Sequence, residues 1–205
     1  MSDTQKPLLV ECLTFECPRD ILNEALSGNG PFIVKGVLQR ANIKNQNGRL
    51  YKKETLIREA AKYETDFVRE RRALGELDHP ESSVVNLQNV SHNVIEMHWS
   101  GDDLVGTIEI LPTPNGNILK ELFKSNIRLG ISSRGMGTVK KDLREEVDVV
   151  QDDFELIAFD FVSNPSTRGA FMFAASPLKE GIVRNPFTNR WESTENIIRD
   201  ILSEI

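Results

Sequence analysis

Residues 90–111 read VSHNVIEMHWSGDDLVGTIEIL, and they carry the clearest structural pattern in the chain. In the first half, apolar residues such as Ile95 and Trp99 alternate with polar ones, a period of two that is typical of a strand with one buried face. His98 falls on the opposite face, and His92 lies in a polar stretch, so we expect both at the surface. The Ser-Gly-Asp-Asp sequence that follows favours a hairpin turn into a second strand.

Further strands and helices surround this hairpin. We expect strands at 32–38, 128–140, 154–162 and 169–175, and amphipathic helices at 53–71, 117–124 and 193–204. Many strands with a few helices between them predict a strand-rich α+β fold with a closed or nearly closed sheet. The pattern predicts an N-terminal segment over 1–30, a main domain over 31–178, and a C-terminal tail with a short helix over 179–205.

Composition limits the possible functions. The chain has 205 residues, of which 39% are hydrophobic and 27% charged, which suits one globular core. The net charge of −6 argues against a nucleic-acid binder, because phosphate contacts need clustered Lys and Arg. Cys12 and Cys17 form no CxxC pair, so structural zinc is not indicated. Without a signal peptide or an apolar run of about 20 residues, we expect an intracellular protein with no membrane partner.

A histidine lies on a restricted backbone in residues 75–80, Gly-Glu-Leu-Asp-His-Pro. Pro80 removes a backbone donor and biases His79 toward an extended conformation. A general base needs a ring that is fixed in this way. A surface histidine in an acidic loop accounts for the same residues. A metal site built from His79 and its acidic neighbours is a third possibility, but no HExxH or comparable helical pair supports it.

Two hydroxyls lie among glycines in residues 129–137, Leu-Gly-Ile-Ser-Ser-Arg-Gly-Met-Gly. Small residues give a substrate close access to the backbone, so Ser132 and Ser133 are candidate nucleophiles. The N–H groups around Arg134 and Gly135 could form an oxyanion hole, with the guanidinium ordering that turn. A glycine-rich turn or a phosphate-binding loop is the alternative, although the lysine and spacing of a P-loop are absent.

Asp160 interrupts the apolar run 154–162. A buried carboxylate is costly unless another group pairs with it. If Asp160 accepts a hydrogen bond from one ring nitrogen of His79, it would fix the tautomer and stabilise the imidazolium. Alternatively, Asp160 caps a turn or points to solvent on an edge strand.

Together these segments resemble the prohead (capsid maturation) proteases of T-even-type tailed phages. The matching pieces are residues 45–51 (Asn-Gln-Asn-Gly-Arg-Leu-Tyr), 73–80 and 130–135, with a looser match at Asp160 and 164–166. The likeness spans roughly residues 32–175 in the right order. It implies a fold like the herpesvirus assemblins, a β-barrel of about seven strands surrounded by helices. It also implies a serine endopeptidase that needs no cofactor.

The resemblance also implies residue roles. His79 falls on the family's histidine, Ser132 on its serine, and Asp160 where the third triad member is expected. The herpesvirus relatives have a second histidine in that third place, so an aspartate departs from them. Ser133 better fits their Ser-x-Gly pattern, but adjacent strand residues point to opposite faces, and only one serine can meet the histidine. We choose Ser132 from the alignment.

The biological setting follows from the same resemblance. We expect the protein to act in the host cytoplasm inside the assembling prohead, where it cleaves scaffold and major capsid proteins and itself after Glu in Leu/Ile-x-Glu. Such tripeptides end at Glu11, Glu24, Glu180 and Glu204, which predicts trimming to about 25–180, and another ends at Glu76. We expect a homo-oligomer, for which a ring is one arrangement. The alternative is a non-catalytic capsid or tail component with the same barrel.

Overall fold

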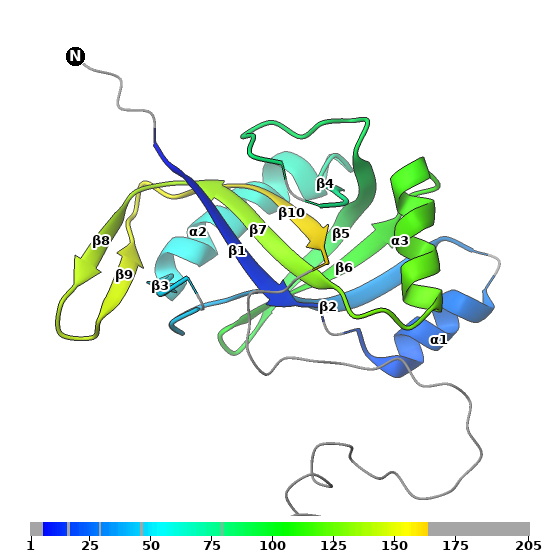
Figure 1. Cartoon of the computed structure of the whole chain (residues 1–205), viewed down its shortest axis with the longest axis horizontal. Coiled ribbons are helices and arrows are strands. Elements are labelled where there is room, and N and C mark those ends of the chain that lie inside the picture. The colour runs from blue at the N-terminus through cyan, green and yellow to red at the C-terminus, as the bar shows by residue number, and fades with distance from the viewer. Residues whose placement is uncertain (1–5, 16, 29, 46, 79, 164–205) are drawn as a thin grey trace, which may run out of the picture. The chain divides into compact units, whose positions relative to one another are not determined.

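Residues 6–163, except 16, 29, 46 and 79, are described by the structure, a computed structural model (Figure 1). The strand predicted at 169–175, the helix predicted at 193–204 and the tail over 179–205 lie outside the described residues. The strands are β1 (Leu8–Thr14), β2 (Phe32–Arg40), β3 (Arg49–Leu50), β4 (Leu74–Glu76), β5 (Val90–Ser100), β6 (Asp103–Ile110), β7 (Gly130–Met136), β8 (Val139–Asp142), β9 (Val147–Val150) and β10 (Glu155–Val162). The helices are α1 (Arg19–Ser27), α2 (Lys53–Tyr63), the π-helical turn η1 (Glu64–Val68) and α3 (Pro114–Lys124).

The strands form three sheets, with the orders β1-β7-β10, β2-β6-β5-β4 and β3-β9-β8. The hairpin predicted at residues 90–111 is the antiparallel pair β5–β6, which lies in the middle of the second sheet. Figure 1 shows β7 between β1 and β10, with the β8–β9 hairpin extending away from that sheet. The strand predicted over 128–140 is thus divided, because it leaves the first sheet after β7 and continues as β8 in the third.

The α+β class is confirmed, but the described residues form no closed barrel. On one side the first two sheets meet where Leu77, just after β4, bridges Phe161 of β10. On the other side β1 and β2 form no ladder in the described part of the chain. The carbonyl of Val10 in β1 instead accepts hydrogen bonds from the side chains of Asn47 (3.0 Å) and Arg49 (3.5 Å). Side chains therefore occupy the edge that a closing strand would need.

One face of β10 packs against the aromatic core, and the other face does not. The rings of Phe15 and Phe123 pack edge-on against Phe161, with centroid distances of 4.9 and 5.6 Å. Phe123 belongs to α3, which begins after Thr113, whose hydroxyl accepts a hydrogen bond from a backbone N–H of the first turn. Because side chains alternate along a strand, Phe161 faces this core and its neighbour Asp160 faces away from it.

The N-terminal segment contributes a full strand, although the main domain was predicted to begin only at residue 31. β1 pairs with β7 along its whole length, from Leu8 opposite Met136 to Thr14 opposite Gly130. Glu11 of β1 is buried, and its carboxylate accepts hydrogen bonds from a set of side chains in the matching segment 45–51, namely Asn45, Asn47, Arg49 and Tyr51. That segment therefore holds β1 in place beside the serine-bearing strand.

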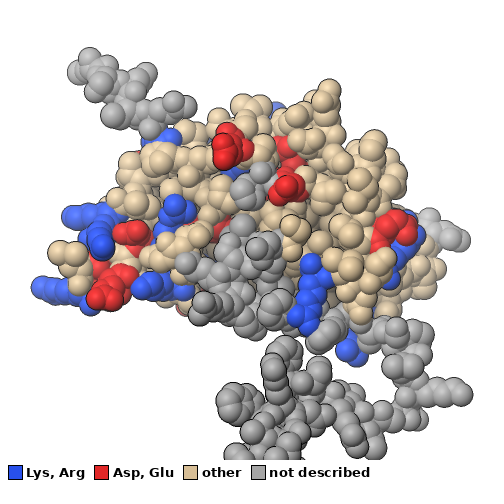
Figure 2. Space-filling view, viewed as in Figure 1, with Lys and Arg blue, Asp and Glu red and all other residues tan. Residues whose placement is uncertain are grey.

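The surface mixes charges of both signs. Figure 2 shows Lys, Arg, Asp and Glu side chains gathered over the β8–β9 hairpin. The charged residues there are Lys140, Lys141, Asp142, Arg144, Glu145, Glu146 and Asp148. Among the residues that the structure describes, no helix has the length and apolar character required to span a membrane.

Candidate active site

Ser132 lies on β7, the central strand of the first sheet. It is fully buried, and Asp160 of β10 lies directly opposite in the antiparallel ladder. Opposed residues of an antiparallel pair project from the same face, so the hydroxyl and the carboxylate share one face of the sheet. Among the described residues, Ser132 Oγ has no hydrogen-bond partner.

Ser133 belongs to the opposite face. Its hydroxyl accepts a hydrogen bond from Gln39 Nε2 of β2 at 2.7 Å, and both residues are buried. Gln39 Oε1 in turn accepts a hydrogen bond from the backbone N–H of Arg40 at 2.9 Å. The two serines therefore differ in environment. Ser133 is bonded to the second sheet, whereas the Ser132 hydroxyl remains available on the Asp160 face.

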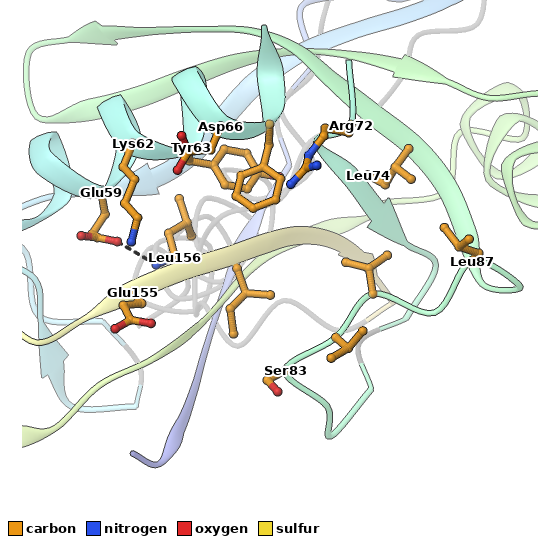
Figure 3. Close-up of a pocket in the computed structure, with 14 residues that line it drawn as sticks. Glu59, Lys62, Tyr63, Asp66, Arg72, Leu74, Ser83, Leu87, Glu155 and Leu156 are labelled. Atoms are coloured by element: carbon orange, nitrogen blue, oxygen red, sulfur yellow. Dashed lines mark hydrogen bonds between the residues drawn. The ribbon is translucent and has the colours of Figure 1, made fainter. Parts of the chain in front are cut away.

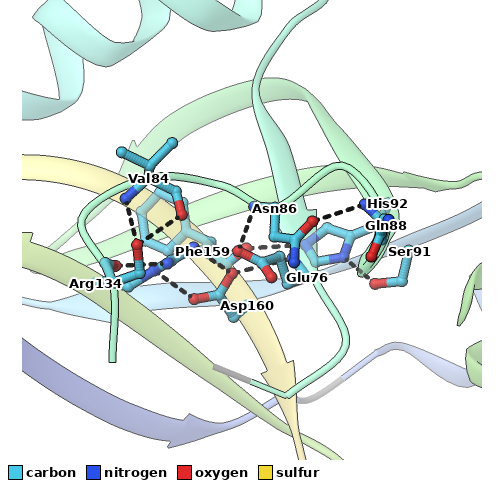
Figure 4. A network of polar contacts seen from close by, with 10 residues as sticks. Glu76, Val84, Asn86, Gln88, Ser91, His92, Arg134, Phe159 and Asp160 are labelled. Atoms are coloured by element: carbon cyan, nitrogen blue, oxygen red, sulfur yellow. Dashed lines mark hydrogen bonds and ion pairs between the residues drawn. The ribbon is translucent and has the colours of Figure 1, made fainter. Parts of the chain in front are cut away.

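Arg134 is the centre of a buried charge network (Figure 4). Its Nη1 donates to the carbonyl of Ser82 at 2.8 Å, and its Nη2 donates to Glu76 Oε1 at 3.1 Å and to Asp160 Oδ1 at 3.2 Å. The Glu76 backbone N–H also donates to Asp160 Oδ1 at 3.0 Å, and Glu76 Oε1 accepts from the Asn86 N–H at 3.0 Å. All three charged side chains are 0% exposed. Two carboxylates thus share one guanidinium.

Unsatisfied polar atoms gather at the same place. The buried side-chain atoms without a hydrogen-bond partner in the described chain are Glu76 Oε2, Asn93 Oδ1, Ser132 Oγ, Arg134 Nε and Asp160 Oδ2. All but the asparagine oxygen belong to the Ser132 face and the charge network. Arg134 Nε and Asp160 Oδ2 lie 3.0 Å apart as an ion pair, without the alignment of a hydrogen bond. Because buried polar groups are normally hydrogen-bonded, this concentration marks a site with capacity for further partners.

Burial raises the pKa of Asp160 to about 6, although the Arg134 guanidinium and the Glu76 N–H oppose that rise. The Glu76 carboxylate adds to it. A carboxyl group perturbed by burial beside specific charges is common in functional sites. β10 is an edge strand of its sheet, yet Asp160 is 0% exposed, so the alternative that it points to solvent is wrong.

His79 lies outside the described residues, but the chain on either side of it is described. Asp78 donates its backbone N–H to the carbonyl of Phe161 in β10 at 2.7 Å. The carbonyl of Ser82 accepts the hydrogen bond from Arg134 of β7. The residues that flank the histidine are therefore bonded to the two strands that carry the aspartate and the serine.

His92 is fully buried in β5, so its prediction as a surface residue is wrong. Its ring nitrogens lie 2.8 Å from Ser91 Oγ and 3.0 Å from the carbonyl of Phe159. Burial lowers the pKa of His92 to about 4. The ring is neutral near pH 7, with the proton on Nε2, because a carbonyl can only accept. Both nitrogens are occupied, so His92 is a structural residue. His98 is exposed, as predicted.

Gly135 lies beside an irregularity of β10. The register shifts between Leu156 and Ala158, which lie opposite Gly135 and Arg134. A Cβ atom on Gly135 would lie 2.4 Å from the ring of Phe154, so a larger residue would force the strands apart. β7 has partners on both sides, and this bulge is where its ladder with β10 is interrupted.

A cavity of about 550 Å³ lies beside the loop that follows Ser82 (Figure 3). It is lined by α2 and η1 on one side and by β4, β10 and the loop 83–87 on the other. Val84 and Leu87 in its wall are 70% and 74% exposed. Lys62 and Arg72 also line it, and neither forms a salt bridge with a described residue. The segment after β4 thus contacts the charge network at Ser82 and the cavity in the next residues.

The described residues contain no group of three or more His, Cys, Asp and Glu side chains that could hold a metal ion. What they do contain is a buried serine hydroxyl, an opposed carboxylate, and the two flanks of the His79 segment, which are bonded to the same strands. These are the components of acyl transfer by a serine nucleophile.

Comparison with known proteins defines the class. The chain belongs to the prohead core protein serine protease family, which matches residues 7–178 and so includes β1. The prohead core protein protease of Enterobacteria phage T4 is 31% identical over 144 residues, which cover 68% of this chain and 66% of that protein. This chain therefore spans 66% of the length of that relative. The solved structure of the bacteriophage T4 capsid assembly protease is similar with a TM-score of 0.67 and 25% identity, covering 78% of this chain and 99% of that one.

Proposed function

We propose that this chain is a phage prohead serine endopeptidase with Ser132 as its nucleophile. The observation that carries the proposal is the buried, unpartnered hydroxyl of Ser132, which faces Asp160 in a member of the prohead core protein serine protease family. An unsatisfied hydroxyl is a cost to folding. A role as nucleophile explains why the Ser132 hydroxyl is present despite this cost.

In the proposed reaction Ser132 attacks the peptide carbonyl, and His79 takes the hydroxyl proton and passes it to the leaving amine. Asp160 orients His79 and stabilises the imidazolium. Asp160 Oδ2 supports this role, because it accepts no hydrogen bond from a described residue, although it is ion-paired with Arg134 Nε at 3.0 Å.

We place the oxyanion donors at the backbone of Arg134 and Gly135. Support comes from their position directly after the two serines on β7. The bulge opposite them leaves Ile157 of β10, and not a residue of β7, outside the ladder. Each such donor is worth about 3–4 kcal/mol in other serine proteases. The Ser133 hydroxyl then has a supporting role through its bond to Gln39 on β2.

The proposed substrates are scaffold and major capsid proteins cut after Glu in Leu/Ile-x-Glu, inside the assembling prohead in the host cytoplasm. The cavity beside the loop after Ser82 is the proposed binding site. Its apolar wall at Val84 and Leu87 suits an aliphatic side chain. Lys62 and Arg72 are its cations for a carboxylate, in a lining that also holds Glu59, Asp66 and Glu155. The T4 relative is named as a capsid assembly protease, which agrees with capsid-related substrates. We also propose that the protein forms a homo-oligomer, for which a ring is one arrangement.

Self-trimming is proposed at the C-terminal end only. Glu11 is buried beneath its side-chain donors and Glu76 is 0% exposed, so neither presents a cleavable peptide in the folded chain. Cutting after Glu24 would separate β1 from the domain. The tripeptides ending at Glu180 and Glu204 lie outside the described residues. Intact masses of the active protein and of Ser132→Ala after incubation test this: a loss confined to the C-terminal end is expected, and a loss of residues 1–24 contradicts it.

A fluorophosphonate probe tests the nucleophile directly. The folded protein should gain one adduct, which peptide mapping should place on Ser132. An adduct on Ser133 would transfer the role to that residue. The competing function is a non-catalytic capsid or tail component, favoured by the complete burial of Ser132. Inertness toward the probe, together with intact scaffold and capsid substrates after incubation, would favour that alternative.

A further inference from the structure

Arg134 lies two residues after the proposed nucleophile, so both side chains project from the same face of β7. Its guanidinium reaches three separate parts of the chain: the Glu76 carboxylate on β4, the Asp160 carboxylate on β10, and the Ser82 carbonyl after β4. A planar fork of donors can serve partners in several directions at once. The side chain is completely buried, so solvent does not replace any of these contacts.

Two of these partners enclose the segment that contains the proposed base. Glu76 is the last residue of β4, Ser82 follows it in the loop, and His79 stands midway between them in the sequence. Asp78 attaches the first half of the segment to the Phe161 carbonyl of β10 at 2.7 Å. The second half returns to the first sheet where Ser82 accepts from the guanidinium at 2.8 Å. One side chain therefore holds both ends of the segment.

The anchoring extends further along the loop. Glu76 Oε1 accepts from the Asn86 N–H at 3.0 Å, and the Ser82 hydroxyl accepts from the Val84 N–H at 3.1 Å. The ladders of β7 with β1 and β10 consist of backbone contacts and do not depend on the guanidinium. Loss of the Arg134 side chain would therefore release the loop before it releases the sheet.

We propose that Arg134 is a positioning residue, which holds residues 76–82 against the serine-bearing strand and thereby sets the separation of His79 from Ser132. The proposal rests on the proposed function for the identity of the two catalytic groups, but the anchoring does not depend on catalysis. Lysine cannot replace the arginine, because one ammonium group cannot meet a carbonyl and two carboxylates that lie in different directions.

Hydrogen exchange of Arg134→Lys tests the anchoring. Peptides covering residues 77–89 should exchange at least about tenfold faster than in the wild type, while peptides from β7 and β10 keep their protection. Arg49→Lys is the matched control, because it weakens another partly buried ion pair, with Glu11, at 2.6 Å. It should leave residues 77–89 unchanged. Wild-type exchange there in folded Arg134→Lys would overturn the proposal.

Activity tests the consequence for catalysis. Arg134→Lys should reduce kcat about a hundredfold with little change in KM, as expected for a displacement of about 1 Å between reacting groups. Methylguanidinium should restore part of the activity of Arg134→Ala, and methylammonium should not; equal rescue by both ions would contradict the geometric argument. If Arg134→Ala fails to fold, Glu76→Gln should show the same faster exchange at 77–89 with the sheet intact. If the wild type neither reacts with the fluorophosphonate probe nor cleaves substrate, the proposed function is wrong. Hydrogen exchange at residues 77–89 would still show whether Arg134 anchors the segment.

Discussion

The two neighbouring serines should respond to alanine substitution with opposite signs. Ser132→Ala removes a buried hydroxyl that has no partner among the described residues. An unsatisfied buried polar group costs about 1–3 kcal/mol, so its removal should raise the free energy of unfolding by about 1 kcal/mol after the small loss of packing. Ser133→Ala leaves Gln39 Nε2 buried without its acceptor, which should lower the free energy of unfolding by about 1–3 kcal/mol.

Thermal unfolding of mass-verified intact protein measures this difference. For a chain of this size 1 kcal/mol corresponds to about 2–4 °C in Tm, so Ser132→Ala should melt above the wild type and Ser133→Ala below it. Ser100→Ala, at an exposed position of β5, sets the baseline for a neutral substitution. Proteolytic activity should follow the opposite order to stability. Cleavage should be lost in the more stable Ser132→Ala and retained in the less stable Ser133→Ala.

The reasoning fails if Ser132→Ala is destabilised as much as Ser133→Ala. The hydroxyl of Ser132 would then have a structural partner, and its conspicuous lack of one could no longer support a role as nucleophile. Stability gained on deleting a catalytic group is the expected sign of an active site that is kept at a cost to folding.

Three further predictions concern other parts of the chain. Glu11→Gln should lower the free energy of unfolding by about 3 kcal/mol in urea titrations, because it removes the buried charge of the partly buried ion pair with Arg49. Glu109→Gln, which breaks the ion pair with the exposed Arg71, should cost less than about 1 kcal/mol. Equal effects would contradict the role of Glu11 in holding β1 in place. Since the pKa of His92 falls from 6.5 to about 4 on folding, the unfolded chain binds a proton in this window that the folded chain does not, so stability is complete above pH 6.5 and falls by about 1.4 kcal/mol per unit as the pH drops toward 4. Asp160, with its raised pKa, acts in the opposite direction over the same window, so the quantity to follow is the difference between the wild type and His92→Gln, which should lack the histidine contribution; parallel pH curves would refute the assignment. Arg72→Glu in the cavity wall should raise KM for a Leu-x-Glu peptide at least about tenfold with kcat retained, while Arg69→Glu, at an exposed residue bonded to Glu64, should not; an unchanged KM in Arg72→Glu would remove the cavity from substrate binding.

Local patterns predicted the elements that depend on local signals. β2, β5, β6 and α3 appear near where periodicity placed them, and β10 where an apolar run placed it. The helix predicted at 53–71 is divided into α2, which ends at Tyr63, and η1, which ends at Val68. α3 begins three residues earlier than expected, because Pro114 is suited to the first turn and Thr113 caps it.

Long-range pairing explains what the patterns missed. β1 reads as a weak strand because Glu11 interrupts its apolar residues, and only the donors of residues 45–51 make that carboxylate acceptable in the interior. His92 was misplaced for a similar reason. Its polar neighbours Ser91 and Asn93 suggested exposure, yet all three residues are buried. Polar residues that satisfy one another across the fold have no signature in a sequence window.

In the candidate site, too, local sequence predicted single residues but not the long-range contacts between them. The local setting identified Ser132 and Ser133 as candidate nucleophiles and Asp160 as a candidate acid, and the family resemblance chose Ser132. The structure places Ser132 and Asp160 directly opposite each other. The partnership of Glu76 with Arg134 was not foreseen, although the Gly-Glu-Leu-x-His-Pro motif already contained the glutamate. Its meaning depends on the strand that carries Arg134, which lies far along the chain and is brought near only by folding.

The position of β7 between β1 and β10 has a consequence for synthesis on the ribosome. The strand that bears the serine receives one neighbour from a stretch translated long before it and the other from a stretch translated after it. No nascent chain that ends before β10 can complete this sheet, and the pairing spans most of the domain, which slows its formation. Proteolytic activity that needs this sheet therefore begins only when translation of the domain is nearly finished. An incomplete chain cannot cleave the proteins made beside it.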